Sequence, residues 1–592
     1  MNIVVAAGLL ITILTAIPVA MQLRRHPRGL VILFFAEMWE RFSYYGMRGL
    51  LIFYLTQHFL LDDAAAQGRY GAYTSLVYLL PLIGGYLADR FLGARKAIGF
   101  GAILLVAGHL TMAYEGHPAT QTLTYQGATY DFVAEGRQSA RSVRLKLPDG
   151  LHDYAPAPGG GIEIKGLPAA APLPSLLPAG SYSFGVRDRD ETALNVMYLA
   201  LSLIVVGVGF LKSNISSIVG ALYPQGDPRR DGGFTLFYYG INLGSFWSAI
   251  GCAWLGQSVG WWAGFGLAGV GMTAGFLAFV LGRKTLEGKG EPPDPVALTK
   301  LLFGPIDTEK LIYLLALPSV GLVWLLIGRP PLVGWMLGAG SIGVLAYIGW
   351  FMWKRCTPIE AQRLGLALVL IVSSVVFWTL FEQAGSSLNQ FAERNTDLSV
   401  GFGQSMTAAQ AQSFNPGVIL IGAPIFAALW AWLGTRGKDL NPVVKFGLAL
   451  VQVGLGFFVL VWGASMHDRA YQVPLVFLAV AYLLHTTGEL CLSPVGLSQM
   501  TKLSPVAVVS TMMAVWFLAL SWAQWLGGMV AQLTASETVG GQVLDPAAAL
   551  ATYVGVFQAI GAWAVGIGVV MLAVSPWLSR WAHGASDTKP LA

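Results

Sequence analysis

The segment AEMWERFSYYGMRGLLIFYL (residues 36–55) places four charged side chains in an apolar stretch long enough to cross a membrane. Glu37, Arg41 and Arg48 recur at helical spacing and share one face, and Glu40 lies beside Arg41 on nearly the same face. Each such side chain costs roughly 2.5–3.5 kcal/mol at the centre of a bilayer. These charges must therefore face the interior of a helix bundle or a wet cavity, where carboxylates beside cations can take up and release protons.

The composition indicates that this protein lies in a lipid bilayer and not in water. Of 592 residues, 55% are hydrophobic and only 11% are charged, whereas soluble proteins carry about a quarter charged residues. Repeated apolar runs predict an all-α polytopic membrane protein, since a membrane β-barrel would alternate in polarity. The net charge of +5 belongs to loops and gives no sign of nucleic-acid binding. The three cysteines lie far apart without a metal-ligand pattern, so we expect no metal and no cofactor.

Fourteen apolar spans follow one another, and residues 3–21 add an apolar segment that we interpret as an extra helix or anchor, not a cleaved signal. The fourteen spans are 29–58, 70–90, 97–115, 193–222, 234–257, 260–282, 311–328, 331–353, 362–388, 416–434, 443–465, 473–497, 505–531 and 548–578. Lys and Arg cluster in alternate connections, which predicts that those connections and the C-terminus are cytoplasmic. The N-terminus is then outside if residues 3–21 cross.

Two connections are long. Residues 116–192 form an insertion on the outer side that is too polar to span, and its alternating segments between turn signals favour a small β-rich domain over a linker. Residues 283–310 predict a cytoplasmic linker between the sixth and seventh core spans.

Three more spans hold isolated charges, namely Lys212, Glu382 and Glu489. Counting 1.5 Å per residue places Arg48 and Glu382 in the outer half of the membrane and Lys212 and Glu489 in the inner half. Each pair joins the first half of the chain to the second. The pairs could simply pin helices together, but making one while breaking the other would open a cavity to alternate sides, which we favour.

The residues then point to a family. EMWERFSYYG strongly resembles the ExxERFxYYG signature of the proton-dependent oligopeptide transporter family, within the major facilitator superfamily. Further blocks resemble the family in order, over about residues 29–580 without the insertion. They are GGYLADRFLGARKAI (84–98), FTLFYYGINLGSF (234–246), FWTLFEQAGSS (377–387), NPGVILIGAPIFAALW (415–430) and GELCLSPVG (488–496).

The resemblance implies two six-helix bundles around a central cavity, with two extra helices between them. The expected organisation is an extra N-terminal segment (1–28), the first three helices (29–115), a periplasmic insertion (116–192), the rest of the first bundle (193–282), a linker (283–310), two extra helices (311–355), the second bundle (356–580) and a cytoplasmic tail (581–592).

By the same resemblance, family roles pass to matching residues. Glu37, Glu40 and Arg41 would couple protons, together with Glu382, which would pair with Arg48 in an outer gate; Lys212 and Glu489 would pair in an inner gate. Arg48, Lys212 and Asn242 would face a peptide carboxylate, and Glu489 its amino group. Tyr44, Tyr45, Tyr78, Trp378, Asn415 and Trp516 would line side-chain pockets. Asp89, Arg90, Arg95 and Lys96 would latch helix ends in a cytoplasmic loop.

The implied activity is proton-coupled symport of di- and tripeptides across a bacterial inner membrane, by a monomer and without enzymatic chemistry. A symporter of another solute such as nitrate, or a transporter-like nutrient sensor, remains as an alternative. One departure is the usual KPN of the fourth helix, which is KSN here (Lys212, Ser213, Asn214). Without the proline we expect a straighter helix.

Overall fold

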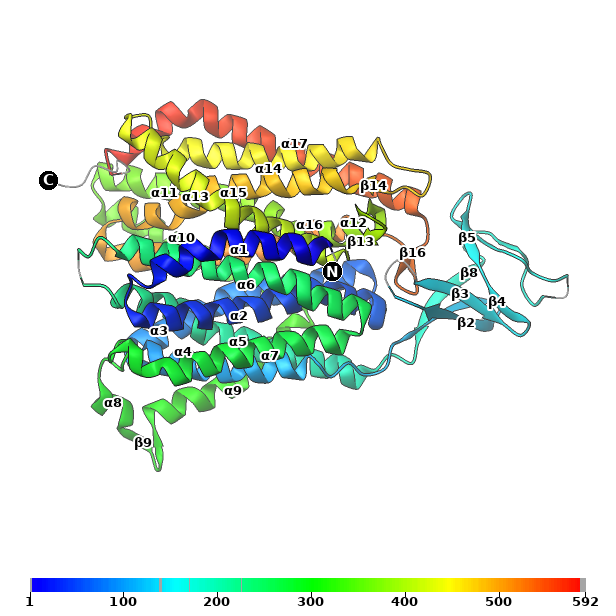
Figure 1. Cartoon of the computed structure of the whole chain (residues 1–592), viewed down its shortest axis with the longest axis horizontal. Helices are drawn as coiled ribbons and strands as arrows, with labels where there is room; N and C mark the ends of the chain where they lie inside the picture. Colours follow the sequence, from blue (N-terminus) through cyan, green and yellow to red (C-terminus); the bar gives the residue numbers. More distant parts are fainter. Residues whose placement is uncertain (1–2, 138–140, 170, 225, 586–592) are drawn as a thin grey trace.

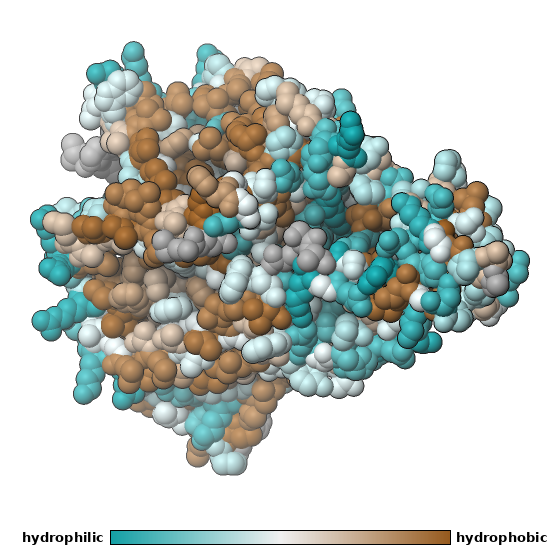
Figure 2. Space-filling model, turned by 45° about the vertical axis from the view of Figure 1, so that its right-hand side comes forward, coloured by the Kyte–Doolittle hydropathy of each residue, from teal (hydrophilic) through white to brown (hydrophobic). Residues whose placement is uncertain are grey.

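Most of the chain forms long helices that lie side by side (Figure 1). The computed structural model describes residues 3–137, 141–169, 171–224 and 226–585, so the end of the predicted tail, 586–592, lies outside the described residues. Within these ranges, twelve helical segments are long and apolar enough to cross a membrane. Hydrophobic residues cover the middle of the helical body, and polar residues gather at its two ends and over the insertion (Figure 2). The protein is a multi-pass membrane protein.

The first half of the bundle, here called the N half, contains six long helices. They are α2 (Arg28–Phe53), α3 (Asp63–Leu87), α4 (Ala94–Thr111), α5 (Glu191–Ala221), α6 (Arg230–Ser258) and α7 (Trp261–Gly282). Helix α2 packs on α6 and α7, and α5 packs on α3 and α4. This arrangement surrounds α2 with other helices, so the four charges of its sequence are all buried within protein.

The second half, the C half, also contains six long helices. They are α11 (Pro358–Phe381), α13 (Phe414–Thr435), α14 (Pro442–Ala464), α15 (Leu475–Leu503), α16 (Val509–Gln532) and α17 (Pro546–Leu578). The halves meet where α16 packs on α3 and α13 packs on α6. At the first crossing, a Cβ on Gly71 would lie 2.8 Å from the Cα of Gly528, so only glycine allows these two helices to approach so closely.

Three further long helices lie beside the two halves. Helices α9 (Thr308–Ile327) and α10 (Pro330–Arg355) contact α3, and α9 also contacts α5 while α10 contacts α16, so the pair joins both halves. Helix α1 (Ile3–Leu23) packs against α6 and α13 and exposes most of its apolar surface. The linker before α9 forms the short helix α8 (Pro295–Thr299) and strands β9 (Leu301–Phe303) and β10 (Ile306–Asp307).

The insertion between α4 and α5 is built from strands. A five-stranded sheet has the order β4-β3-β2-β1-β8, and a second sheet has the order β5-β6-β7. The strands are β1 (Thr120–Tyr125), β2 (Ala128–Glu135), β3 (Ser142–Leu147), β4 (Gly150–His152), β5 (Tyr154–Ala157), β6 (Gly161–Ile164), β7 (Leu176–Leu177) and β8 (Tyr182–Arg187). Between β1 and β2, Gln126 and Gly127 both have positive φ, the backbone of a tight hairpin.

The end of the bundle that carries this insertion is called the insertion end below. Short segments of the C half also lie there: α12 (Ser387–Asn395), β11 (Thr396–Asp397), β12 (Ser399–Gly401), β13 (Gln404–Ser405), β14 (Val473–Pro474) and the hairpin β15–β16 (Thr538–Val539, Gln542–Val543). Val539 and Leu544 are buried in one apolar cluster with Leu123, Phe132 and Val143 of the insertion. The insertion is therefore connected to the N half by the chain and packed on the C half by its core.

The start of α3 and the course of α5 can be compared with the predictions from the sequence. Helix α3 begins at Asp63, capped by the Asp62 side chain, seven residues before the predicted start at residue 70. Helix α5 continues without interruption through Lys212, Ser213 and Asn214, as the absence of the family's proline predicts.

Candidate functional site

A central cavity of about 160 Å³ lies between the two halves. Eight of the predicted site residues line it, four from each half of the bundle: Tyr45, Arg48, Tyr78, Asn242, Trp378, Glu382, Asn415 and Glu489. They come from α2, α3 and α6 of the N half, from α11, α13 and α15 of the C half, and from the helical turn that follows α11. Helices from both halves thus contribute charged and aromatic side chains to one enclosed space.

Arg48 connects the halves on the side of the cavity nearest the insertion end. Its Nη2 donates to Glu382 Oε2, and its Nε donates to the Tyr70 hydroxyl at 2.6 Å. The guanidinium carbon lies 5.9 Å from the centre of the Tyr45 ring. Arginine suits this position because its planar fork reaches two acceptors while its flat face covers an aromatic ring.

Glu489 occupies the C-half wall of the same cavity. Its Oε2 accepts a hydrogen bond from Asn415 Nδ2 at 3.1 Å, and the same amide donates to Thr486 Oγ1 at 3.0 Å. The predicted partner, Lys212, is elsewhere: its Nζ lies 3.7 Å from the centre of the Tyr78 ring. In this conformation the structure brings Arg48 and Glu382 together and keeps Lys212 apart from Glu489.

The acidic and basic residues of the ExxER segment form a buried cluster on α2. Arg41 Nε lies 2.8 Å from Glu37 Oε1 and 2.7 Å from Glu40 Oε2. Two acids therefore share one cation, and the remaining glutamate oxygens, Glu37 Oε2 and Glu40 Oε1, have no hydrogen-bond partner among the described residues. Two carboxylates held beside a single positive charge form a group that can release or bind one proton at low cost.

Other predicted residues lie outside the cavity lining. Tyr44 is buried beside Tyr45, and Trp516 packs against Gly496. Asp89 and Arg90 lie in the helical turn after α3, while Arg95 pairs with Glu291 and Lys96 pairs with Glu309. These last two basic residues hold the linker and the start of α9 against the N half.

Sequence reasoning missed a second ion pair between the halves. Arg394 at the end of α12 donates to both oxygens of Asp63 at the start of α3, at 2.6 and 2.8 Å, and both side chains are buried. Gln390 adds a bond to Asp63 at 3.2 Å. Sequence reasoning also missed other residues of the cavity wall, among them Tyr238, Gln412 and Tyr482.

The contacts between the halves are concentrated toward the insertion end. Besides the two arginine pairs, Gln67 donates to Gln390 at 2.6 Å, Asn389 donates to the Gly49 carbonyl at 2.9 Å, and Gln57 donates to Glu393. Among the described residues, the hydrogen bonds that join the N half to the C half all lie on this side of the cavity. The bundle is thus closed at the insertion end.

Two helical halves, a charged cavity between them and a closure at one end are the architecture of a membrane transporter of the major facilitator type. The POT family model matches residues 95–303 and 340–545, and the chain belongs to this family. An uncharacterized transporter of Bacillus subtilis (strain 168), YclF, is 33% identical over 568 residues, which are 94% of this chain and 96% of the relative. Dipeptide and tripeptide permease A of Edwardsiella piscicida is 30% identical over 96% of this chain and 98% of its own.

Solved structures give the same fold. A glutamate-to-glutamine mutant of a peptide transporter POT, in complex with alafosfalin, is 32% identical and superposes with a TM-score of 0.69 over 94% of this chain and 96% of its own. A POT family transporter in complex with 5-aminolevulinic acid is 26% identical, with a TM-score of 0.68, over 94% of this chain and 97% of its own.

Proposed function

We propose that this protein is a proton-coupled symporter that imports di- and tripeptides by alternating access. The observation that carries the proposal is the central cavity, which has the cation Arg48 in its N half and the carboxylate Glu489 with the amide Asn415 in its C half. A short peptide is a zwitterion, and this distribution of charge complements its carboxylate and its amino group. The permease relatives and the transporter solved with alafosfalin support the substrate class.

The cavity walls also suit many peptide side chains. Tyr45, Tyr78 and Trp378 contribute apolar surface, and the buried indole Nε1 of Trp378 has no hydrogen-bond partner among the described residues. Apolar walls with few fixed polar groups recognise the peptide backbone and its ends without selecting one side chain. Asn242 and Lys212 would assist Arg48 on the carboxylate side, Lys212 after moving away from Tyr78.

Proton coupling would involve two groups of ionisable side chains, the Arg48–Glu382 pair and the buried cluster on α2. Protonation of Glu382 would weaken its pair with Arg48 and release the closure at the insertion end, while the cluster of Glu37, Glu40 and Arg41 would carry the proton toward the other end. A proton moving inward gains about 2.3 kcal/mol per 100 mV of membrane potential, enough to concentrate a peptide about fiftyfold. This direction assumes a bacterial inner membrane with the insertion in the periplasm, the C-terminus in the cytoplasm and the protein acting as a monomer.

Uptake into liposomes tests the proposal. Purified protein would be reconstituted, and uptake of labelled dialanine measured with an inward proton gradient and an inside-negative potential. We expect accumulation by the wild type. Glu40→Gln should lose accumulation but keep counterflow exchange, since exchange needs binding and movement without net proton transfer. Glu163→Gln, which changes an exposed glutamate of the insertion in the same way, should behave as wild type.

Two results would contradict the proposal. Absence of uptake and of competition by any di- or tripeptide would leave another solute, such as nitrate, or a sensor role as the explanation of the cavity. Accumulation by Glu40→Gln at the wild-type level would keep the peptide but remove this glutamate from proton coupling.

A further inference from the structure

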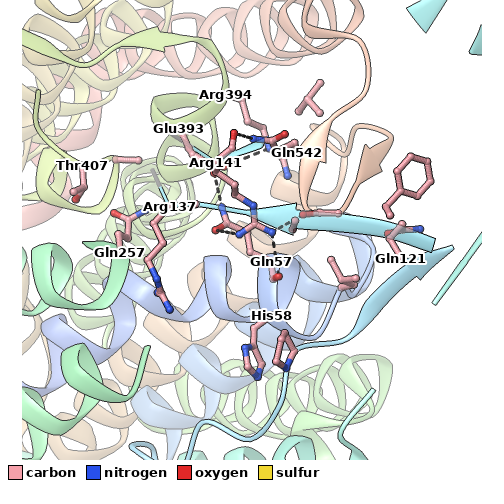
Figure 3. A pocket seen from close by; sticks show the side chains of 18 of the residues that line it. Gln57, His58, Gln121, Arg137, Arg141, Gln257, Glu393, Arg394, Thr407 and Gln542 are labelled. Atoms are coloured by element: carbon pink, nitrogen blue, oxygen red, sulfur yellow. Dashed lines mark hydrogen bonds and ion pairs between the residues drawn. The ribbon is translucent and has the colours of Figure 1, made fainter. Parts of the chain in front are cut away.

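A second and larger cavity, of about 1050 Å³, lies at the insertion end (Figure 3). Three parts of the chain enclose it. The insertion forms one wall through β1, β2 and β3. The N half contributes the helical turn after α2 (Tyr54–His58), the end of α6 and the start of α7, and the C half contributes α12, the segments after it and the hairpin β15–β16. The space is ample for a tripeptide, since pockets for small ligands measure roughly 300–1,000 Å³.

This outer cavity adjoins the closure between the halves. Arg394, which holds Asp63, and Glu393, which accepts from Gln57, both line it. Breaking these contacts would open a way from the outer cavity toward Arg48 and the central cavity. The outer cavity is therefore the last space that a solute occupies before the closed end of the bundle.

The charges on its walls are separated. Arg137, Arg141 and Lys146 belong to the insertion, whereas Glu393, Asp397 and Asp468 belong to the C half. Glu115, which follows α4, also lines the cavity, and its Oε2 accepts a hydrogen bond from the backbone N–H of Trp262 at 2.9 Å. The insertion also contributes Asp131, but its carboxylate is taken by Arg187, at 2.7 Å. Arg394 is likewise committed to Asp63. A solute in the cavity thus meets available cations on the insertion side and available carboxylates on the C-half side.

Arg141 is held in place by neutral groups. Its guanidinium donates to the Gln57 carbonyl at 3.4 Å, to Gln57 Oε1 at 3.3 Å and to the Gly540 carbonyl at 2.6 Å, and Gln542 donates to the Arg141 carbonyl at 2.8 Å (Figure 3). Its Nε–H has no hydrogen-bond partner among the described residues. Burial lowers the pKa of Arg141, because the attraction of Glu393 offsets only part of the lost hydration. The charge is fixed in position but not neutralised by an ion pair.

We propose that the outer cavity is an antechamber that binds short zwitterionic peptides before transport, with the peptide carboxylate on the basic wall of the insertion and the amino group toward Glu393 and Asp397. This inference rests on the proposed function and adds a second peptide site to it. A basic wall collects the carboxylate end of a peptide near the closed end and raises its local concentration there. The carboxylate would meet Arg137 and Lys146 at the exposed rim and Arg141 deeper inside.

Uptake kinetics with charge-removing variants test the antechamber. Arg137→Gln and Lys146→Gln each remove one exposed cation from the cavity wall, and neither residue makes an ion pair among the described residues. Lys165→Gln removes the same charge from the insertion at an exposed position outside the cavity. We expect the KM for dialanine to rise severalfold in the first two variants, with the maximal rate unchanged, and to stay at the wild-type value in Lys165→Gln.

A binding measurement provides the second readout. In a variant with the central site disabled, Arg48→Ala with Glu489→Ala, labelled dialanine should still bind weakly and saturably. N-acetyl-dialanine, which keeps the carboxylate, should compete for this site better than dialanine amide, which lacks it. Normal wild-type uptake together with unchanged KM values in Arg137→Gln and Lys146→Gln would overturn the antechamber and leave the proposed function intact. Absence of peptide uptake by the wild type would overturn both.

Discussion

A substitution at Arg48 can test whether transport needs its hydrogen-bonding geometry or only its positive charge. Arg48→Lys keeps the charge but cannot reach the Tyr70 hydroxyl and Glu382 together from one ammonium. A lost hydrogen bond to a charged group costs roughly 1.5–3 kcal/mol, so the initial rate of dialanine uptake should fall about tenfold or more. Arg283→Lys, at an exposed position, is the matched control and should keep the wild-type rate. An equal rate in both variants would mean that charge alone suffices at residue 48.

The buried pair of Asp63 and Arg394 predicts a thermodynamic effect. Asp63→Asn would leave the buried cation Arg394 with only Glu393, 4.0 Å from its Nε, as a counter-charge, and the loss should approach the roughly 3–5 kcal/mol of a broken buried ion pair. The melting temperature of the purified protein should fall clearly, measured by intrinsic fluorescence on heating. Adding Arg394→Gln should recover part of the loss because the orphan charge is gone. A double variant as unstable as the sum of both single variants would show that the two side chains are not coupled.

The sequence identified the charged residues inside the membrane spans better than the ion pair Asp63–Arg394 beyond their ends. A charge inside a long apolar run is costly and therefore marks a functional position, which is why the sequence reveals Glu37, Arg48, Glu382 and Glu489. Asp63 and Arg394 lie just beyond the ends of the predicted spans, where charged residues are ordinary. Their burial depends on two segments that are 331 residues apart meeting in space, and no local pattern reports such a contact.

Among the elements, the hairpin β15–β16 is the one that fixes the insertion to the C half. Val539→Asp would bring a carboxylate into the shared apolar cluster, where Val539 is fully buried. The contact would lose at least about 1.5 kcal/mol of burial energy and the charge would add its cost of desolvation. Amide hydrogen exchange in β1–β3 should speed up while exchange in the helices stays unchanged. Val186→Asp places the same charge on an exposed valine of β8 and should have little effect. If β1–β3 exchange as slowly as in the wild type in both variants, the hairpin does not hold the insertion.

The helices and the insertion were predictable to different degrees. Long apolar runs and clusters of basic residues locate the spans. Helix α3 begins before the predicted apolar span because residues 63–69, DAAAQGR, have a charge at each end and a glycine and are not apolar enough to belong to the span. In the insertion, alternating residues and tight turns indicate strands. The order of its sheets depends on pairing between strands as far apart as β1 and β8, and the docking of Val539 and Leu544 into its core depends on contacts across more than 350 residues. Such contacts follow from the packing of the whole chain.

For the whole molecule, the concentration of contacts at one end predicts that transport requires that end to open. Gln67 and Gln390 belong to different halves, and their side chains are hydrogen-bonded at 2.6 Å. In a protein whose three cysteines are replaced by alanine, Gln67→Cys with Gln390→Cys should react with a short bifunctional thiol reagent. The cross-linked protein should lose dialanine uptake, because the halves can no longer separate at the insertion end.

The matched control for this cross-link lies within one half. Arg363, in α11 of the C half, donates to the His583 carbonyl at 3.1 Å, and His583 directly follows the turn (Ser579–Ala582) at the end of the last C-half helix. Arg363→Cys with His583→Cys should accept the same reagent and keep its uptake, since alternating access moves each half largely as a rigid body. A reagent with a reducible spacer allows the first pair to be released again, and uptake should then return. Full uptake by the cross-linked Gln67–Gln390 pair would show that solute reaches the central cavity without separation of the halves at this end.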